Sequence, residues 1–172
     1  YGTYERNKIG VKSEQVWPKK KYQNAYTELV VKWVKDFGRT IDYLSTRKDI
    51  DTSKLAYYGF SWGGRLGTIV AAAEGRLKTS ILLLGGFGAG ASPPEVDEFN
   101  YAPRVHIPTL MLNGKYDMFF PLDISVDPMY ERLGTSQGQK RLLLYDSDHY
   151  VPLKDVTRET LAWLDRYLGP VH

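Results

Sequence analysis

Apolar residues recur at helical spacing between Ala25 and Arg47, and this periodicity predicts one long surface helix over that range. The apolar positions are Leu29, Val30, Trp33, Val34, Phe37, Ile41 and Leu44. Gly38 interrupts the pattern at a modest cost to helix stability. The polar stretch from Asp49 to Ser53 is typical of a turn that leads into the next element.

Beyond this helix the chain alternates short apolar runs with helical stretches. The apolar runs cover 55–58, 79–85, 108–113 and 141–145, and the helical stretches cover 65–74, 129–133 and 156–168. Runs without polar alternation favour strands buried on both faces, as in a parallel sheet covered by helices. The pattern predicts an α/β fold with a mostly parallel sheet, and the absence of repeats or linkers predicts a single domain over 1–172.

Composition narrows the possible partners. The 172 residues are 42% hydrophobic and 13% aromatic, which suits one globular domain with its own core. A net charge of +3 is too small for a nucleic-acid-binding face, so we expect the run Lys19–Lys21 to be a solvated loop. No segment is apolar enough to span a membrane, and we expect no membrane partner.

Two features leave the cellular compartment open. The first ten residues are polar and charged, unlike a signal peptide, so an export signal is expected to lie upstream or to be absent. The chain has no cysteine, which excludes disulfides and thiolate metal sites but fits reducing and oxidising compartments alike.

A serine in a glycine-rich turn is the strongest chemical signal. Residues 59–63 read Gly-Phe-Ser-Trp-Gly, between the predicted strand at 55–58 and the predicted helix at 65–74. Such a turn lifts the hydroxyl of Ser61 above the sheet, and the glycines let strand and helix approach without a Cβ clash. The motif predicts acyl transfer by Ser61, the competing interpretation being a helix-capping or loop serine.

A serine nucleophile needs a base, and the chain has three histidines. His149 follows the predicted strand at 141–145, and loops after parallel strands converge on one edge of a sheet. His106 precedes a strand and belongs at the opposite rim, whereas His172 is the last residue. His149 is therefore the predicted base, rather than a loop histidine bonded to a neighbouring aspartate.

The acid that orients this base is expected after the preceding strand. Asp117 lies in the loop after 108–113, where its carboxylate can hold the imidazole tautomer. Asp123 is the alternative, while Asp146 and Asp148 are too close in sequence to His149 to orient it from the far side.

Between Gly85 and Arg104 the chain is rich in glycine, alanine and proline, and is too broken for a long helix. The segment is typical of a lid or pocket-wall loop. A phosphate-binding loop is the competing interpretation, but no Gly-Lys-Ser/Thr sequence follows.

With the order Ser61, Asp117, His149, the chain resembles the α/β-hydrolase superfamily, and most of the sequence takes part in the match. The segments 59–64, 113–117 and 148–149 are most similar to the branch of prolyl-oligopeptidase-type peptidases, acetyl-xylan-type esterases and dienelactone-hydrolase-like enzymes. The resemblance implies a serine hydrolase in which the backbone N–H of Trp62 is one oxyanion donor. The three histidines are not spaced as a ligand cluster and the acids are scattered, so we expect no metal site and no cofactor.

The chain departs from this family at its N-terminal side. Family members carry further strands there, and a loop in that half supplies the second oxyanion donor, whereas residues 1–6 resemble the segment after the fourth strand. Losing one donor typically costs about 10²- to 10³-fold in rate. The elbow strand would also lose a neighbour, so we expect a second copy or an upstream portion of the parent protein to cover its edge.

The leading hypothesis is a carboxylic ester hydrolase with an acyl-enzyme on Ser61, acting on small-molecule esters. One alternative is a serine peptidase of the prolyl-oligopeptidase type. The other is a catalytically weak or inactive half-fold that serves as a binding or assembly domain.

Overall fold

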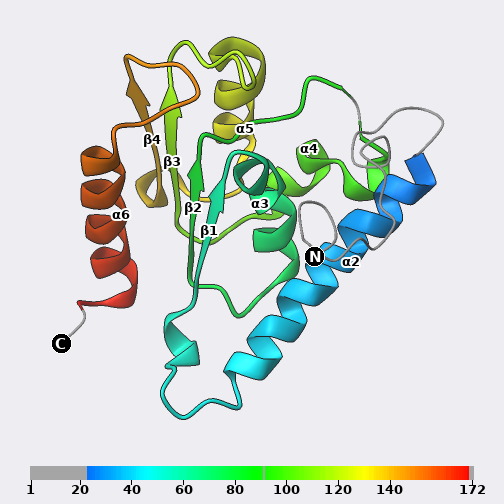
Figure 1. The fold of residues 1–172 in the computed structure, drawn as a ribbon, viewed down its shortest axis with the longest axis vertical. Helices are drawn as coiled ribbons and strands as arrows, with labels where there is room; N and C mark the ends of the chain where they lie inside the picture. The colour runs from blue at the N-terminus through cyan, green and yellow to red at the C-terminus, as the bar shows by residue number, and fades with distance from the viewer. Residues whose placement is uncertain (1–22, 91, 171–172) are drawn as a thin grey trace.

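The computed structural model describes residues 23–90 and 92–170, in which four parallel strands form one sheet (Figure 1). The strands are β1 (Ala56–Phe60), β2 (Thr79–Leu83), β3 (Thr109–Gly114) and β4 (Lys140–Tyr145). Their order in the sheet follows their order in the chain, and Gly59, Leu82, Met111 and Leu142 form one row across it. All carboxyl ends therefore meet at the same edge of the sheet.

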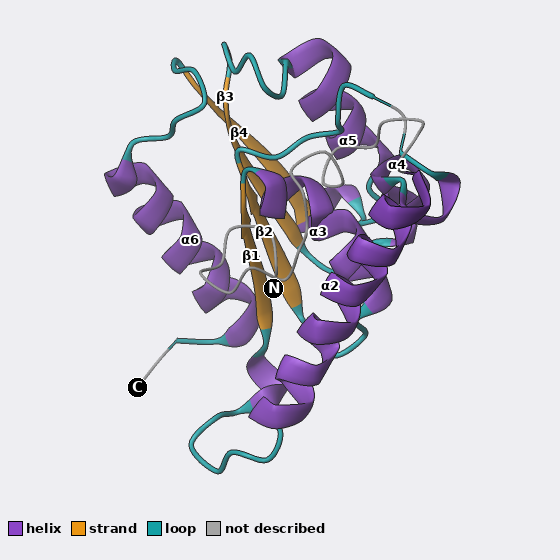
Figure 2. Ribbon diagram, turned by 45° about the vertical axis from the view of Figure 1, so that its right-hand side comes forward, coloured by secondary structure: helices purple, strands orange, loops and turns teal. Residues whose placement is uncertain are grey.

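Helices cover both faces of this sheet (Figure 2). On one side lie α2 (Gln23–Leu44), α3 (Trp62–Ala73) and α5 (Asp127–Arg132), whose apolar residues share a core with β1, β2 and β3. On the other side α6 (Leu153–Leu168) packs its Val156 and Trp163 against β2 and β3. The short α4 (Glu98–Tyr101) lies within the long connection from β2 to β3. The predicted α/β architecture with a parallel sheet is confirmed.

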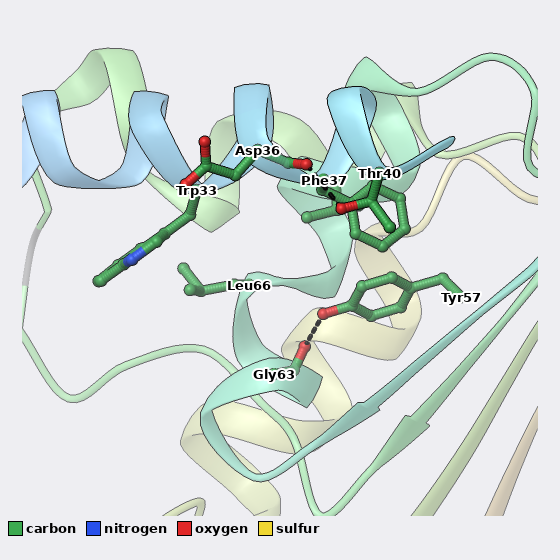
Figure 3. A pocket seen from close by; sticks show the side chains of 8 residues that line it. Trp33, Asp36, Phe37, Thr40, Tyr57, Gly63 and Leu66 are labelled. Atoms are coloured by element: carbon green, nitrogen blue, oxygen red, sulfur yellow. Dashed lines mark hydrogen bonds between the residues drawn. The ribbon is translucent and has the colours of Figure 1, made fainter. Parts of the chain in front are cut away.

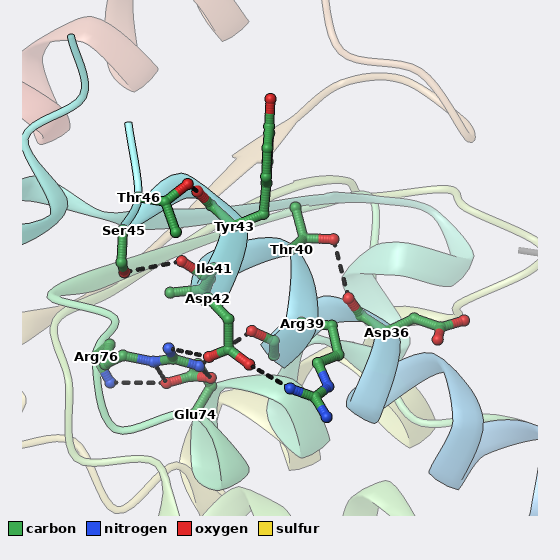
Figure 4. Close-up of polar contacts among 11 residues, drawn as sticks. Asp36, Arg39, Thr40, Ile41, Asp42, Tyr43, Ser45, Thr46, Glu74 and Arg76 are labelled. Carbon is green, nitrogen blue, oxygen red and sulfur yellow. Dashed lines mark hydrogen bonds and ion pairs between the residues drawn. The ribbon is translucent and has the colours of Figure 1, made fainter. Parts of the chain in front are cut away.

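Helix α2 continues through Gly38 without interruption. A Cβ on Gly38 would lie 3.6 Å from Glu74 Oε2, so the helix passes close to the end of α3. There Arg76 donates hydrogen bonds to the Gly38 carbonyl (3.2 Å), to Asp42 Oδ1 (2.7 Å) and to Glu74 (Figure 4). This polar network ties the second half of α2 to the end of α3.

The prediction that the strands are buried on both faces is wrong for the two outer ones. Strands β2 and β3 are buried throughout, but in β4 only Lys140 is buried. In β1 the side chains of Tyr58 and Phe60, which lie on the α6 face, are 48% and 55% exposed. Each outer strand has a neighbour on one side only within the described residues, so an apolar run cannot by itself reveal how much of a strand is covered.

The helix predicted from Arg65 begins three residues earlier, at Trp62, directly after Ser61. The basic run Lys19–Lys21 and His172 lie outside the described residues, as do residues 1–6. In 23–90 and 92–170, no helix combines the length and the apolar character needed to cross a membrane.

Candidate active site

Ser61 occupies a strained turn between the end of β1 and the start of α3. Its φ of 52° and ψ of −108° lie outside the regions that residues with a side chain usually adopt. Its N–H donates to the Leu83 carbonyl at 2.8 Å, and its own carbonyl accepts from Arg65 N–H at 2.9 Å. The sheet and the helix thus hold the residue from both sides.

Close backbone contacts explain the glycines around Ser61. A Cβ on Gly59 would lie 2.3 Å from the Gly63 carbonyl oxygen, and a Cβ on Gly85 would lie 2.5 Å from the Gly64 carbonyl carbon. Neither distance is possible for a real side chain. The start of α3 therefore sits directly against the ends of β1 and β2, which sets the height of Ser61 above the sheet.

Behind the turn, Tyr57 of β1 supports the first turn of α3 (Figure 3). Its hydroxyl donates to the Gly63 carbonyl at 2.6 Å, and the residue is only 8% exposed. Burial raises the pKa of Tyr57 well above its usual range, so the hydroxyl stays protonated and remains a donor. From the sequence Tyr57 had no predicted role at the site, and this bond, which joins residues six positions apart through the fold, was missed.

His149 lies in the loop after β4 and reaches back to Ser61. Its Nε2 is 2.9 Å from Ser61 Oγ, and its Nδ1 is 2.7 Å from Asp117 Oδ2. The His149 side chain is 21% exposed, so the ring is largely shielded from solvent. The structure therefore joins Ser61, His149 and Asp117 in one chain of hydrogen bonds.

Asp117 is held rigidly after β3. Its side chain is fully buried, and its Oδ1 accepts the backbone N–H groups of Phe119 (2.8 Å) and Phe120 (3.1 Å). Its other oxygen is left for His149. The carboxylate can thus fix the orientation of the imidazole, because it has little freedom of its own.

The other candidates from the sequence lie elsewhere. Asp123 belongs to the following helical turn, Leu122–Val126, and Asp146 pairs with Lys115 Nζ at 2.7 Å. His106 precedes β3, and its Nδ1 lies 3.2 Å from the Gly134 carbonyl oxygen. Among the described residues, no three His, Asp or Glu side chains gather as a metal site would require.

An apolar cavity of about 700 Å³ opens in front of Ser61 and His149. The aromatic residues that line it are Phe60, Trp62, Phe119 and Phe120. Three of these rings, Phe60, Phe119 and Phe120, have centroids 5.0 to 6.0 Å from that of His149. Trp62 is also the first residue of α3, so its backbone lies beside Ser61 at the cavity.

Gly88 and Ala89, from the connection between β2 and β3, line the same cavity. The glycine-rich segment predicted as a lid or pocket-wall loop therefore contributes to the pocket wall. Its start is fixed by Ser125, whose hydroxyl donates to the Phe87 carbonyl at 2.6 Å.

The hydrogen-bonded chain fits one kind of chemistry. An imidazole bonded to a hydroxyl on one side and to a carboxylate on the other can take the hydroxyl proton as the oxygen attacks a carbonyl carbon. The rings of Phe60, Phe119 and Phe120 lie around the imidazole and leave it only partly exposed to solvent.

Comparison with known proteins agrees with this chemistry. The sequence model of the family described as PET hydrolase-like matches residues 18–170. Cutinase 2 of Thermobifida cellulosilytica is 27% identical over 143 residues, which cover 78% of this chain and 51% of the cutinase. The chain spans about half the length of the curated relatives it matches.

Solved structures extend the comparison to the fold. A cold-adapted esterase from an Arctic intertidal metagenomic library superposes with a TM-score of 0.70 at 24% identity, covering 97% of this chain and 66% of the esterase. Acetyl xylan esterase from Paenibacillus sp. R4 gives a TM-score of 0.67 at 22% identity, covering 84% of this chain and 54% of the enzyme. These likenesses confirm the predicted α/β-hydrolase fold.

Proposed function

Because this chain belongs to the PET hydrolase-like family, we propose that it is a serine ester hydrolase that acts through an acyl-enzyme on Ser61. The observation that carries the proposal is the hydrogen-bonded chain from Ser61 Oγ through His149 to Asp117, at the wall of an apolar cavity. Cutinases among the curated relatives and esterases among the structural neighbours support the same reaction class.

Each residue has a role in the proposed reaction. Ser61 Oγ attacks the ester carbonyl carbon while His149 Nε2 takes the hydroxyl proton, and Asp117 stabilises the resulting imidazolium. The backbone N–H of Trp62 donates to the oxyanion. When the tetrahedral intermediate collapses, the C–O bond to the alcohol breaks and His149 gives its proton to the leaving oxygen. Water then attacks the acyl carbon while His149 takes its proton, and the acid is released as Ser61 Oγ regains a proton from His149.

The cavity favours esters with apolar or aromatic groups. Its aromatic walls, formed among others by Phe60, Trp62 and Phe119, offer contact area to such groups and few polar partners. The name of the matching family and the cutinases among the relatives point to esters of polymer type as well as small esters. We therefore propose small apolar esters, and the accessible ester bonds of polyesters, as substrates.

The free edge of β1 is proposed as a contact with further polypeptide. Within the described residues β1 pairs with β2 alone, and the exposed rings of Tyr58 and Phe60 lie beside this edge. Unpaired apolar edges favour pairing with another strand. We propose a second copy of this chain as its occupant, the alternative being an additional portion of the parent protein. Light scattering that shows a clean monomer at all concentrations would count against the second copy.

Hydrolysis of p-nitrophenyl acetate by the wild type and by Ser61→Ala tests the proposed function. We expect turnover by the wild type and a loss of at least about 10³-fold in the variant. Ser53→Ala is the matched control, because Ser53 is exposed and bonds only to Asp51. Equal rates in wild type and Ser61→Ala would reject the proposal.

A further inference from the structure

A buried ion pair lies at the edge of the cavity, against one of its walls. Arg65, in the first turn of α3, donates from Nε to Glu98 Oε1 of α4, and their side chains are 6% and 3% exposed. Arg65 also donates from Nη2 to Ser92 Oγ at 3.0 Å. One guanidinium thus connects the helix that begins directly after Ser61 with two points on the connection from β2 to β3.

The pocket wall, defined here as residues 86–90, rests against this guanidinium. A Cβ on Gly88 would lie 2.4 to 2.6 Å from Cζ, Nη1 and Nη2 of Arg65, so the backbone of the wall packs directly on the guanidinium. Arg65 itself lines the cavity together with Gly88 and Ala89. The position of the guanidinium therefore sets how far the wall stands from Ser61.

The other supports of the wall act at its first residues, where the ring of the buried Phe87 lies 5.4 Å from that of Phe99. Ser125 holds Phe87 through its hydroxyl (2.6 Å) and through the bond from Phe87 N–H to its carbonyl (3.2 Å). Beyond Phe87 the wall has no helical or strand pairing of its own. A flexible glycine-rich segment fixed at one end needs a second anchor to keep one conformation.

Stability alone is a weak reason for a buried ion pair. Removing two charges from water costs several kcal/mol, and apolar residues of similar size are often as stable or more stable at such positions. A planar guanidinium that donates to two partners in a fixed geometry fixes where those partners lie, rather than adding stability. The geometry around Arg65 is therefore best explained by what it holds in place.

We propose that Arg65, paired with Glu98 and Ser92, is a positioning residue that fixes the pocket wall and thereby sets the preference of the site for larger acyl groups. The proposal rests on the proposed ester hydrolase function. A short acetyl group extends little beyond Ser61, whereas a longer acyl group relies on contacts with the wall. A loosened wall weakens the binding of the longer group more, and the effect falls mainly on KM.

The test replaces the pair by apolar residues, Arg65→Met with Glu98→Leu, so that no unpaired charge is left buried. The matched control is Arg76→Met with Glu74→Leu, the same exchange at the other end of α3 (Figure 4), at residues that do not line the cavity. Steady-state kinetics on p-nitrophenyl hexanoate and acetate gives the ratio of the two kcat/KM values. This ratio does not depend on the fraction of folded protein.

We expect this ratio of hexanoate to acetate to fall about tenfold in the Arg65/Glu98 variant, through KM, and to stay unchanged in the control. Backbone order parameters of residues 86–90 from NMR relaxation supply a readout without catalysis, and we expect them to fall below about 0.6 in the same variant. Unchanged order parameters, or lower order parameters with an unchanged ratio, would overturn the proposal. A wild type that hydrolyses neither ester rejects the proposed function, and the order parameters then still decide whether Arg65 anchors the wall.

Discussion

Gly114 and Asp148 approach each other so closely that a Cβ on Gly114 would lie 1.8 Å from the Asp148 carbonyl oxygen. Gly114 ends β3, and Asp148 immediately precedes His149 in the loop after β4. Backbone hydrogen bonds from Lys115 to Tyr145 (2.8 Å) and from Tyr116 to Ser147 (3.0 Å) fasten the same two segments. The contact brings His149 within reach of the loop that carries Asp117.

Gly114→Ala is expected to lower kcat/KM for p-nitrophenyl acetate by at least about 10²-fold, because a displacement of about 1 Å of a catalytic group has effects of that size. The new methyl group meets backbone, which cannot turn away as a side chain would, so the His149 loop must move. Gly138→Ala is the control, since a Cβ there meets nothing within 4 Å. Wild-type kinetics in Gly114→Ala would contradict this account of the loop.

Asp117→Asn tests how His149 is oriented. The Asn carbonyl oxygen can accept the N–H groups of Phe119 and Phe120, which leaves the amide NH₂ facing His149 Nδ1. The imidazole must then carry its proton on Nε2, where it can no longer accept the proton of Ser61. We expect kcat to fall by about 10⁴-fold, as wrong-tautomer variants of such triads do.

Asp123→Asn is the control for this substitution, because Asp123 was the alternative acid from the sequence. Its kcat is expected to stay within about twofold of the wild type. A larger loss in Asp123→Asn than in Asp117→Asn would show that the wrong carboxylate has been assigned.

Tyr57→Phe removes one hydroxyl behind the serine turn. The bond to the Gly63 carbonyl is lost at a site with little access to water, so the free energy of unfolding is expected to fall by about 1 kcal/mol. Because Gly63 follows Trp62, we also expect a few-fold lower kcat with an unchanged KM. Urea unfolding and steady-state kinetics measure the two effects, with the exposed Tyr43→Phe as control. Equal effects of the two substitutions would argue against a supporting role of Tyr57.

The Arg76 network predicts a defined dependence of stability on pH. Hydrogen bonds from Arg76 lower the pKa values of Glu74 and Asp42 below their usual ranges. A carboxyl group whose pKa is lowered in the folded state stabilises the fold above its unfolded pKa, about 4, and this contribution disappears as the pH falls through the folded pKa. Arg76→Met should therefore destabilise the protein at pH 7 and much less at pH 3.

Urea unfolding of the wild type and Arg76→Met at both pH values checks this prediction. Each pair of curves gives the difference in the free energy of unfolding at one pH. A difference that is the same at pH 7 and pH 3 would mean that Arg76 acts through packing rather than through the two carboxylates.

The order of strands and helices could be predicted because their signals are local. Apolar runs and helical periodicity depend on a few neighbouring residues, and the placement of Ser61, Asp117 and His149 after successive strands follows from the parallel sheet. Exposure of Tyr58 could not be predicted, because it depends on which elements cover β1 rather than on β1 itself.

The side-chain contacts that support the site could not be predicted either, because they also join distant parts of the chain. Arg65 and Glu98 are 33 positions apart, and charged residues in a sequence are normally assigned to the surface. Only the fold shows that both are buried and joined. The hydroxyl bond of Tyr57 was equally invisible, because an apolar strand pattern says nothing of where a phenol points.

Labelling of the wild-type chain and of Ser61→Ala with a fluorophosphonate probe, followed by mass spectrometry of the labelled peptide, tests whether Ser61 is an activated nucleophile. We expect one covalent adduct, located on Ser61 and absent from the variant, since such a probe reacts with a serine activated by a neighbouring base. No adduct on the folded wild type, or an adduct that persists in Ser61→Ala, would contradict this role of Ser61.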